Sequence, residues 1–155
     1  MKIYQINVSL VDVPRLYRTF EATANATFAA LHQAIFDAFE RFDPHMYSFF
    51  ITKQDTKNTH TILSAPEITH PENTEDFTGA GPPKPSAVAT TLAAADLAAK
   101  DVFHYLFDFG DSWWHRLQVE AVMESPGQAS YIKLIDAEGI APPQYPEYEE
   151  DEDED

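Results

Sequence analysis

The chain has 155 residues, no cysteine and a formal net charge of −16. The length suits one domain, and the lack of cysteine excludes disulfides, thiolate metal sites and a cysteine nucleophile. Direct binding to nucleic acid is not expected, because it needs clustered lysine and arginine to displace counterions from phosphates. No apolar run resembles a signal peptide or a membrane span, so we expect a cytoplasmic protein with no membrane partner.

The N-terminal part of the chain predicts two strands and a helix. Residues 3–10 alternate polar and apolar side chains, which is typical of a half-buried strand. Residues 15–21 predict a second strand that pairs back on the first. Thr27 is placed to cap a helix over residues 28–41, where apolar side chains recur at helical spacing.

The middle of the chain predicts two further strands, a long loop and a second helix. Residues 46–53 have a strand pattern, and residues 59–63 are expected to return beside them. Residues 66–89 contain five prolines and show no periodicity, so we expect a long Pro-rich loop there. Residues 92–100 predict a short helix with one buried side.

The clearest pattern is an aromatic β-hairpin over residues 103–120. Apolar side chains alternate along two strands, and residues 110–112 supply the turn. A loop of odd length puts both apolar sets on one face, whereas a slip of one residue would reverse every side chain. This register predicts that His115 points into the core and that His104 points to the opposite face.

The C-terminal part predicts a last strand over residues 131–135, a turn at 136–139 and an extended segment over 141–146. One domain is expected over residues 1–146. Residues 147–155 form an acidic tail in which eight of nine residues are acidic. We expect this acidic tail to be disordered because its like charges repel; a docking or DNA-mimicking tail is the alternative.

The expected element order is ββαββ-loop-αβββ. Such an order predicts an α+β fold, with a mainly antiparallel sheet and two helices packed on it.

The segment FHYLFDFGDSWWH, residues 103–115, resembles the Y-x-Y-D-F-G-D-x-W-x-H block of the plasmid pRiA4b ORF-3-like family. Weaker family landmarks follow the same order along nearly the whole chain. They are Pro14 with Tyr17-Arg18 (P-x-x-W-R), Thr27 with Leu31-His32 (T-L-x-x-L-H), residues 45–49 (H-L-x-x-F) and residues 139–143 (G…P-P).

This resemblance implies a roll-like α/β arrangement and a largely uncharacterised family, some members of which are passengers of insertion elements. It implies no particular chemistry. The chain departs from the family pattern after Pro143, where P-P-E-D-x-G-G is common and Gln144-Tyr145-Pro146 stands here. The cysteines often found near that segment are also missing, so no role resting on them or on the E-D pair is carried over.

Asp108, Asp111 and His115 form a candidate catalytic cluster around the hairpin tip. Carboxylates and imidazole suit general acid–base chemistry or a hard metal ion. In the structural alternative, Asp111 stabilises the turn, Asp108 accepts a hydrogen bond from an amide or indole, and His115 packs in the core. No complete catalytic constellation, zinc spacing or phosphate loop occurs in the sequence, and no cofactor is expected.

Trp114, Arg116 and His45 are the candidate binding residues. Trp114 is expected to face away from Trp113, where it is either exposed for recognition of a protein or peptide or covered by the chain's own Pro-rich loop or C-terminal segment. His45 joins a site if the fold brings it to the hairpin tip. We therefore expect a non-catalytic binding or accessory module whose partner is another protein. The alternative is a metal-assisted hydrolase or nuclease-like enzyme that uses the candidate catalytic cluster.

Overall fold

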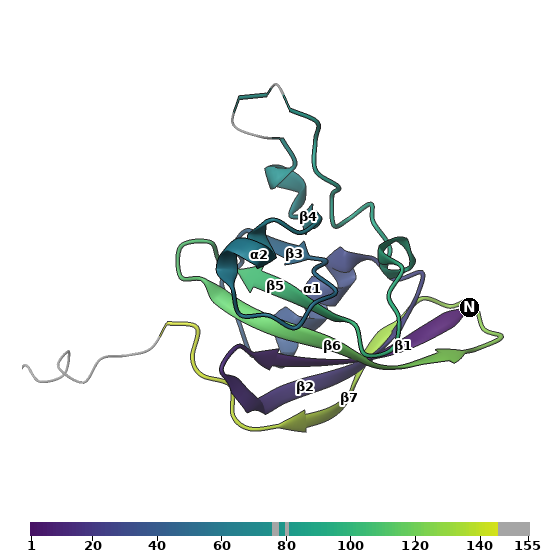
Figure 1. Ribbon diagram of the computed structural model, residues 1–155. Helices are drawn as coiled ribbons and strands as arrows, with labels where there is room; N and C mark the ends of the chain where they lie inside the picture. Colours follow the sequence, from purple (N-terminus) through teal and green to yellow (C-terminus); the bar gives the residue numbers. More distant parts are fainter. Residues whose placement is uncertain (76–77, 80, 146–155) are drawn as a thin grey trace, which may run out of the picture.

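A seven-stranded antiparallel sheet organises the computed structural model, which describes residues 1–75, 78–79 and 81–145 (Figure 1). The strand order is β4-β3-β5-β6-β1-β2-β7. The strands are β1 (Lys2–Leu10), β2 (Val13–Thr23), β3 (Tyr47–Phe50), β4 (Glu67–Thr69), β5 (Val102–Phe107), β6 (Trp113–Glu124) and β7 (Ile132–Glu138). Two α-helices, α1 (Phe28–Ala38) and α2 (Thr59–Leu63), and two 3₁₀ turns, η1 (Pro71–Asn73) and η2 (Leu92–Ala95), complete the elements. The predicted α+β class with a mainly antiparallel sheet is confirmed.

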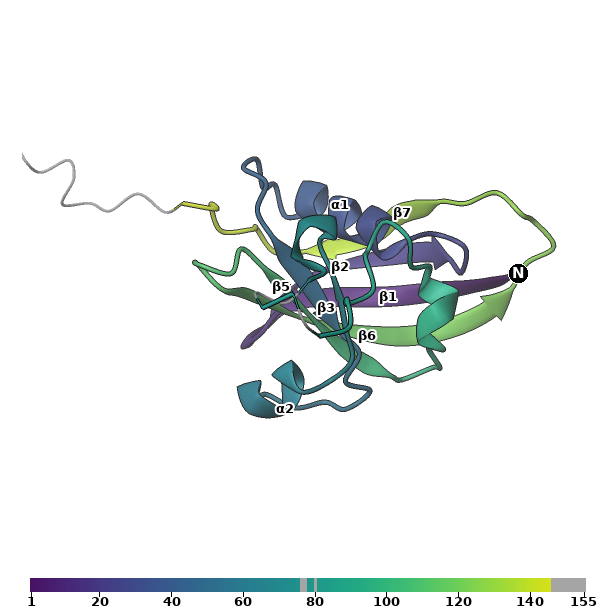
Figure 2. The same cartoon turned by 90° about the horizontal axis from the view of Figure 1, so that it is seen from above.

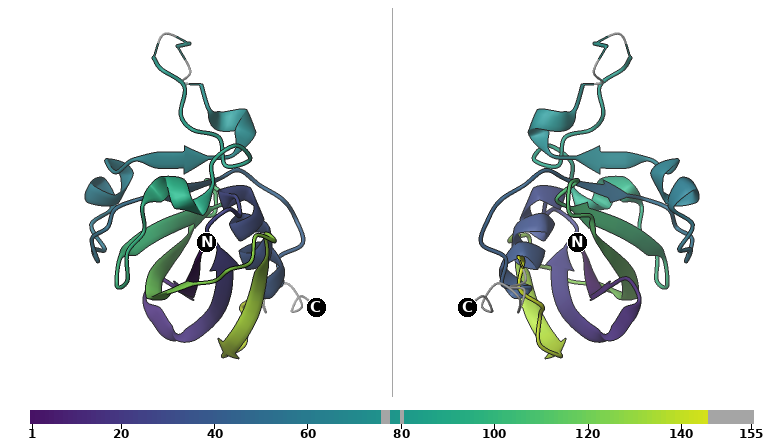
Figure 3. Two further views of the ribbon diagram at one scale, coloured as in Figure 1. Left: turned by 90° about the vertical axis from the view of Figure 1, so that its right-hand side faces the viewer. Right: turned by 90° about the vertical axis from the view of Figure 1, so that its left-hand side faces the viewer.

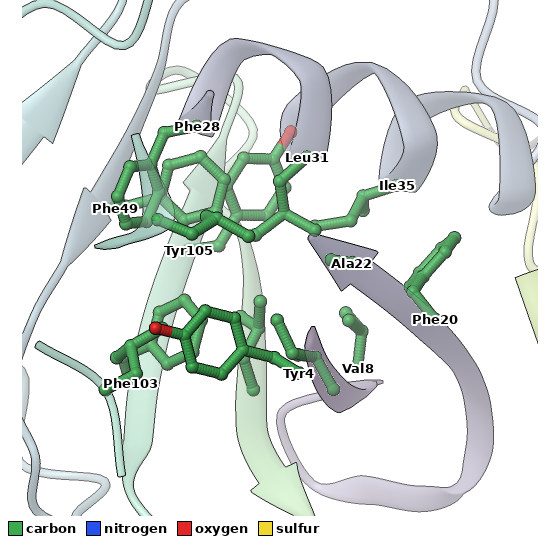
Figure 4. Close-up of a cluster of buried hydrophobic side chains, with 14 of the residues drawn as sticks. Tyr4, Val8, Phe20, Ala22, Phe28, Leu31, Ile35, Phe49, Phe103 and Tyr105 are labelled. Carbon is green, nitrogen blue, oxygen red and sulfur yellow. The ribbon is translucent and has the colours of Figure 1, made fainter. Parts of the chain in front are cut away.

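The sheet curls around helix α1, which lies on its inner side (Figure 3). Thr27 caps α1, as predicted, because its side chain accepts a hydrogen bond from the amide of Ala30 at 3.1 Å. The helix ends at Ala38, and Glu40 adopts a left-handed φ of 58°. Its buried side chains Phe28, Leu31 and Ile35 point at the sheet (Figure 4). Helix α2 lies on the other side of the sheet (Figure 2).

The β5–β6 hairpin has the predicted register. Phe107 pairs with Trp113, so the loop holds five residues, 108–112. Tyr105 therefore lies opposite His115 on the core face, and His104 lies opposite Arg116 on the other face. The odd loop length is confirmed, because it is the length that buries both apolar sets on one side.

Two elements predicted between residues 59 and 100 are wrong. Residues 59–63 form helix α2 instead of a strand, since Asn58 caps them by accepting the amide of Thr61 at 3.2 Å. The helix predicted at 92–100 is only the turn η2, which ends at Asp96 with a φ of 53°. There the amide of Leu92 donates to the carbonyl of Ala26, so tertiary hydrogen bonds replace helical ones.

Two sheet edges also differ from expectation. The segment predicted as a Pro-rich loop contains β4, which pairs with β3 and forms a bridge between Thr69 and Ser86. Strand β7 runs on to Glu138, through the turn predicted at 136–139, because β2 offers partners as far as Tyr17. The turn follows at Gly139, whose φ is 85° and where a Cβ would approach Leu16 to 2.9 Å. The acidic tail at 147–155 lies outside the described residues.

Among the described residues, none of the helices has the length and apolar character that crossing a membrane requires.

Candidate functional site

The hairpin tip is built on Asp108, which is only 6% exposed and adopts a φ of 67°. Its Oδ1 atom accepts hydrogen bonds from the amides of Gly110 at 3.1 Å and Asp111 at 3.2 Å. Its own amide donates to the carbonyl of Met46 at 2.8 Å, which joins the tip to the segment before β3. Asp108 therefore holds the loop in shape, and Asp111 stands exposed beside it.

The fold brings His45 to the hairpin tip. Its Nε2 atom lies 3.4 Å from Oδ2 of Asp108, 3.5 Å from Oδ2 of Asp43 and 2.7 Å from the hydroxyl of Tyr145. The Tyr145 hydroxyl donates to Asp43 at 2.8 Å, so it accepts a hydrogen bond from the imidazole. The bond to Asp43 raises the pKa of Tyr145 to about 12, which keeps the hydroxyl protonated at neutral pH. Asp43, His45, Asp108 and Tyr145 are called the tip cluster below.

Gln144 anchors the C-terminal segment to this tip. Its Oε1 atom accepts the amides of Phe42 at 2.9 Å and Asp43 at 3.0 Å, while its Nε2 atom donates to the carbonyl of Asp43 at 2.8 Å. A glutamate here could accept the same two bonds but could not donate the third. The buried glutamine thus places Tyr145 over His45.

Replacing Gln144 with alanine is expected to lower the free energy of unfolding by about 1–3 kcal/mol, because two partly buried backbone amides lose their acceptor and the side chain of Gln144, which is only 2% exposed, is lost. Urea denaturation followed by circular dichroism measures the change. Gln54, which is exposed, provides the matched control: Gln54→Ala should leave the free energy within about 0.5 kcal/mol. Equal midpoints for the two variants would show that Gln144 does not anchor the segment.

His115 lies fully buried behind the tip, and both of its ring nitrogens are in use. The guanidinium of Arg41 can only donate, so His115 Nε2 accepts from Arg41 Nη2 at 3.3 Å and His115 Nδ1 donates to the carbonyl of Trp113 at 3.0 Å. Burial, aided by the charge of Arg41, lowers the pKa of His115 to about 3. The imidazole is therefore a neutral packing group, which is the structural alternative expected from the sequence.

Arg41 is itself buried, and aromatic rings surround its guanidinium. The guanidinium carbon lies 4.5 Å from the ring centre of Trp113, 5.3 Å from that of Phe107 and 5.8 Å from that of Phe39. Such cation–π contacts take the place of an ion pair, since Arg41 contacts no carboxylate within 4 Å in the described part of the chain. The positive charge thus stays behind the tip, and the exposed side of the tip is acidic.

The three residues of the candidate catalytic cluster do not point toward one common site. Asp108 binds backbone amides, Asp111 is exposed, and His115 is enclosed by Arg41 and Trp113. Across residues 1–75, 78–79 and 81–145, no three carboxylate or imidazole groups are placed to hold one metal ion. The sequence alone did not indicate Asp43, Gln144 or Tyr145, because a gap of about a hundred residues separates the two segments that meet.

Trp114 and Arg116 lie on the opposite face of the hairpin. Trp114 is half-buried and its ring lies 5.9 Å from that of Phe50, with Ile62 of α2 in the same apolar cluster. The cover is therefore α2, and not the Pro-rich loop or the C-terminal segment. Arg116 donates two hydrogen bonds of 2.9 Å to Asp55.

Exposed aromatic side chains accompany the carboxylates of the tip cluster. Phe42 is 69% exposed, and its ring lies 5.8 Å from that of Tyr145 in an edge-to-face arrangement. Phe109, in the hairpin loop, is exposed as well. The tip therefore presents aromatic faces beside Asp43, Asp108 and Asp111.

Comparisons with known proteins show the family of the chain in one case and its fold in another. The model of the family described as "Plasmid pRiA4b ORF-3-like protein" matches residues 2–147. "Uncharacterized protein y4hQ" of Sinorhizobium fredii is 36% identical over 66 residues, which span 43% of this chain and 33% of that protein. A crystal structure of a protein of unknown function, MM3350 from Methanosarcina mazei Go1, superposes with a TM-score of 0.69 at 21% identity and covers 92% of this chain and 73% of that one. This last likeness shows the shared fold.

Proposed function

Because the chain belongs to the plasmid pRiA4b ORF-3-like family, and because the two proteins compared above are described as uncharacterised or of unknown function, we propose its function from its own geometry. The protein is a non-catalytic binding module, and the hairpin tip recognises a basic segment of another protein. The observation that carries this proposal is the meeting of carboxylates with exposed aromatic rings at the tip cluster.

The tip offers a cationic side chain two kinds of favourable contact, carboxylates and aromatic ring faces. Asp43 and Asp108 lie within 3.5 Å of His45, and their charges have no exposed lysine or arginine beside them in the described chain. Phe42 and Tyr145 add exposed ring faces, and cations bind aromatic faces through the ring quadrupole. Aromatic residues are also enriched where proteins bind one another.

The charge of the whole chain supports the same kind of partner. The net charge of −16 attracts basic segments over a distance set by the salt concentration. The acidic tail, eight acidic residues among nine, follows Tyr145 and Pro146 directly in sequence, and Tyr145 belongs to the tip cluster. Association with a basic partner should therefore be fast and should weaken as salt is added.

The proposal is tested by the double substitution Asp43→Asn with Asp108→Asn. Asparagine keeps an oxygen that can accept from Tyr145 and from the loop amides, so the two charges are removed while the fold is preserved. The probe is a fluorescein-labelled nonapeptide of lysine, arginine and glycine, titrated by fluorescence anisotropy at about 50 and 150 mM NaCl. We expect the double substitution to weaken binding about tenfold, because the exposed charge of Asp43 and the buried charge of Asp108 beside it both attract the cationic peptide.

Two controls separate the tip from general acidity. Glu72→Gln with Glu75→Gln removes the same number of charges from exposed positions at and after η1 and should leave the affinity unchanged. A chain that ends after Pro146 lacks the acidic tail and should keep the difference between wild-type and double-substituted tips. The proposal is wrong if the tip substitution has no larger effect than the control pair, or if a glycine–serine nonapeptide binds as tightly as the basic one.

A further inference from the structure

A pocket of about 220 Å³ lies on the face of the sheet that α1 does not cover. Its floor contains Ser9, Arg116 and His104, which are neighbours across strands β1, β6 and β5. One wall is the β1–β2 turn, with residues 10–12 and Pro14, and the other is formed by residues 55–57 of the loop after β3. Arg116 points to this face because it follows His115 directly on β6, and successive side chains of a strand point to opposite faces of the sheet.

Polar contacts hold the two walls and the floor together. The Thr52 hydroxyl lies 2.8 Å from Nδ1 of His104, and Arg116 binds both carboxylate oxygens of Asp55 at 2.9 Å. An ion pair between Lys57 and Asp12 joins one wall to the other. These contacts preform the pocket, which lowers the ordering cost of binding a ligand.

Two hydrogen-bond donors on the floor lack acceptors. Ser9 is only 4% exposed, yet its hydroxyl bonds to no other residue in the described ranges. Arg116 uses Nε and Nη2 for Asp55, so its Nη1 is left without a bond to any described residue. Neither atom is fully enclosed, because the buried side-chain atoms without a partner in the described chain are Nε of Arg41 and Nε1 of Trp113, so both donors remain accessible from the pocket. A ligand oxygen in this pocket would accept from both donors.

The charges around the pocket are balanced in sign. Asp12 and Asp55 are matched by Lys57 and Arg116, and burial lowers the pKa of His104, which favours its neutral form. A simple anion would be repelled by the net charge of −16, and a simple cation would leave the free donors of the floor unmet. A ligand that carries both signs satisfies the pocket, and its apolar part can lie on the wall formed by residues 10–12 and Pro14.

We infer that this pocket binds a small zwitterion of the α-amino acid class. The ligand carboxylate accepts from the Ser9 hydroxyl and from Nη1 of Arg116, and the ligand ammonium faces Asp12 and Asp55. The site is separate from the tip cluster, which binds its partner from a different part of the molecule. The substitution of Asp43 and Asp108 therefore leaves amino acid binding unchanged, and the two proposals can fail independently.

The test is a titration of the ¹⁵N-labelled full chain with L-alanine and L-leucine, followed by amide NMR. Propionate and propylamine, each of which carries one of the two charges, are titrated in parallel. We expect the amino acids to shift the amides of Ser9, Asp55 and Arg116, with affinities at least about tenfold higher than those of the singly charged probes. The inference is overturned if no probe shifts these amides, or if a singly charged probe binds as tightly as the amino acids.

Ser9→Ala sharpens the test, because the wild-type hydroxyl contributes no hydrogen bond within the described chain. The variant should be as stable as the wild type or more stable, yet it should bind L-leucine about tenfold more weakly. Ser130→Ala, at an exposed serine, is the matched control and should change neither property. Equal leucine affinity of Ser9→Ala and wild type would overturn the assignment.

Discussion

Replacing Phe49 with alanine is expected to lower the free energy of unfolding by about 3–5 kcal/mol, which is a large share of the stability of a small domain. Phe49 is fully buried in strand β3. Its ring lies 4.7 Å from that of Tyr105 and 5.1 Å from that of Phe28, so it joins helix α1 to the middle of the sheet (Figure 4). Alanine would leave a cavity that neighbours on three elements cannot all move to fill.

The measurement is urea denaturation followed by circular dichroism, with fluorescence as a second probe of the same transition. Phe42→Ala is the matched control, since it removes the same atoms from a side chain that is 69% exposed. The control should stay within about 0.5 kcal/mol of the wild type. Similar losses for the two variants would contradict the placement of Phe49 in the core.

Acidification from pH 7 to pH 5 is expected to lower the free energy of unfolding by about 4 kcal/mol through two histidines alone. Burial lowers the pKa of His115 to about 3, and burial with repulsion from His70 lowers the pKa of His32 to about 4, both from 6.5. Below pH 6.5 the unfolded chain takes up protons that the folded chain excludes. The contribution is complete above pH 6.5 and is lost as the pH falls toward the folded pKa values.

Other groups titrate as well. The informative quantity is therefore the difference between variants in the slope of the free energy of unfolding against pH. His115→Gln removes one of the two excluded protons and should reduce the loss between pH 7 and pH 5 by about 2 kcal/mol, whatever its effect at pH 7. Gln54→Ala, which alters no titratable group and lies at an exposed position, should keep the wild-type slope. NMR titration of the imidazole resonances measures the pKa of His115 directly, and a value near 6.5 would contradict its burial in the neutral form.

Sequence patterns predicted the elements whose periodicity is local. Strands β1 and β2, helix α1 and the β5–β6 hairpin all follow alternating or helical spacing of apolar residues. The register of the hairpin was also predictable, because the apolar sets on its two strands can share a face only with an odd loop. The inward position of His115 followed from that register.

Short segments were mispredicted for two reasons, a local helix cap at Asn58 and tertiary partners at residues 92–93. Residues 59–63 are too few to distinguish a strand from a helix by periodicity, and the cap from Asn58 decided for a helix. The segment at 92–100 has helical composition, but the carbonyls of Ala24 and Ala26 take the amides of Leu92 and Ala93. A single sequence contains no signal for contacts of that kind.

The candidate site was likewise predictable only in part from the sequence. Asp108 and His45 were recognisable in sequence as polar residues at a turn and at a strand start, and the fold places them 3.4 Å apart. Tyr145 and Gln144 complete the tip through contacts across about a hundred residues. Trp114 was predicted to face away from the core, but only the structure showed that α2 covers it.

The sequence by itself therefore determined the faces of the long elements, the odd hairpin loop and the acidic character of the chain. These properties depend on the spacing and charge of neighbouring residues. The tertiary structure alone decided which polar groups meet: His45 with Asp108 and Tyr145, and Arg116 with Asp55. The physical reason is that such pairs depend on strand order and chain packing, which the local backbone preferences of either partner do not specify.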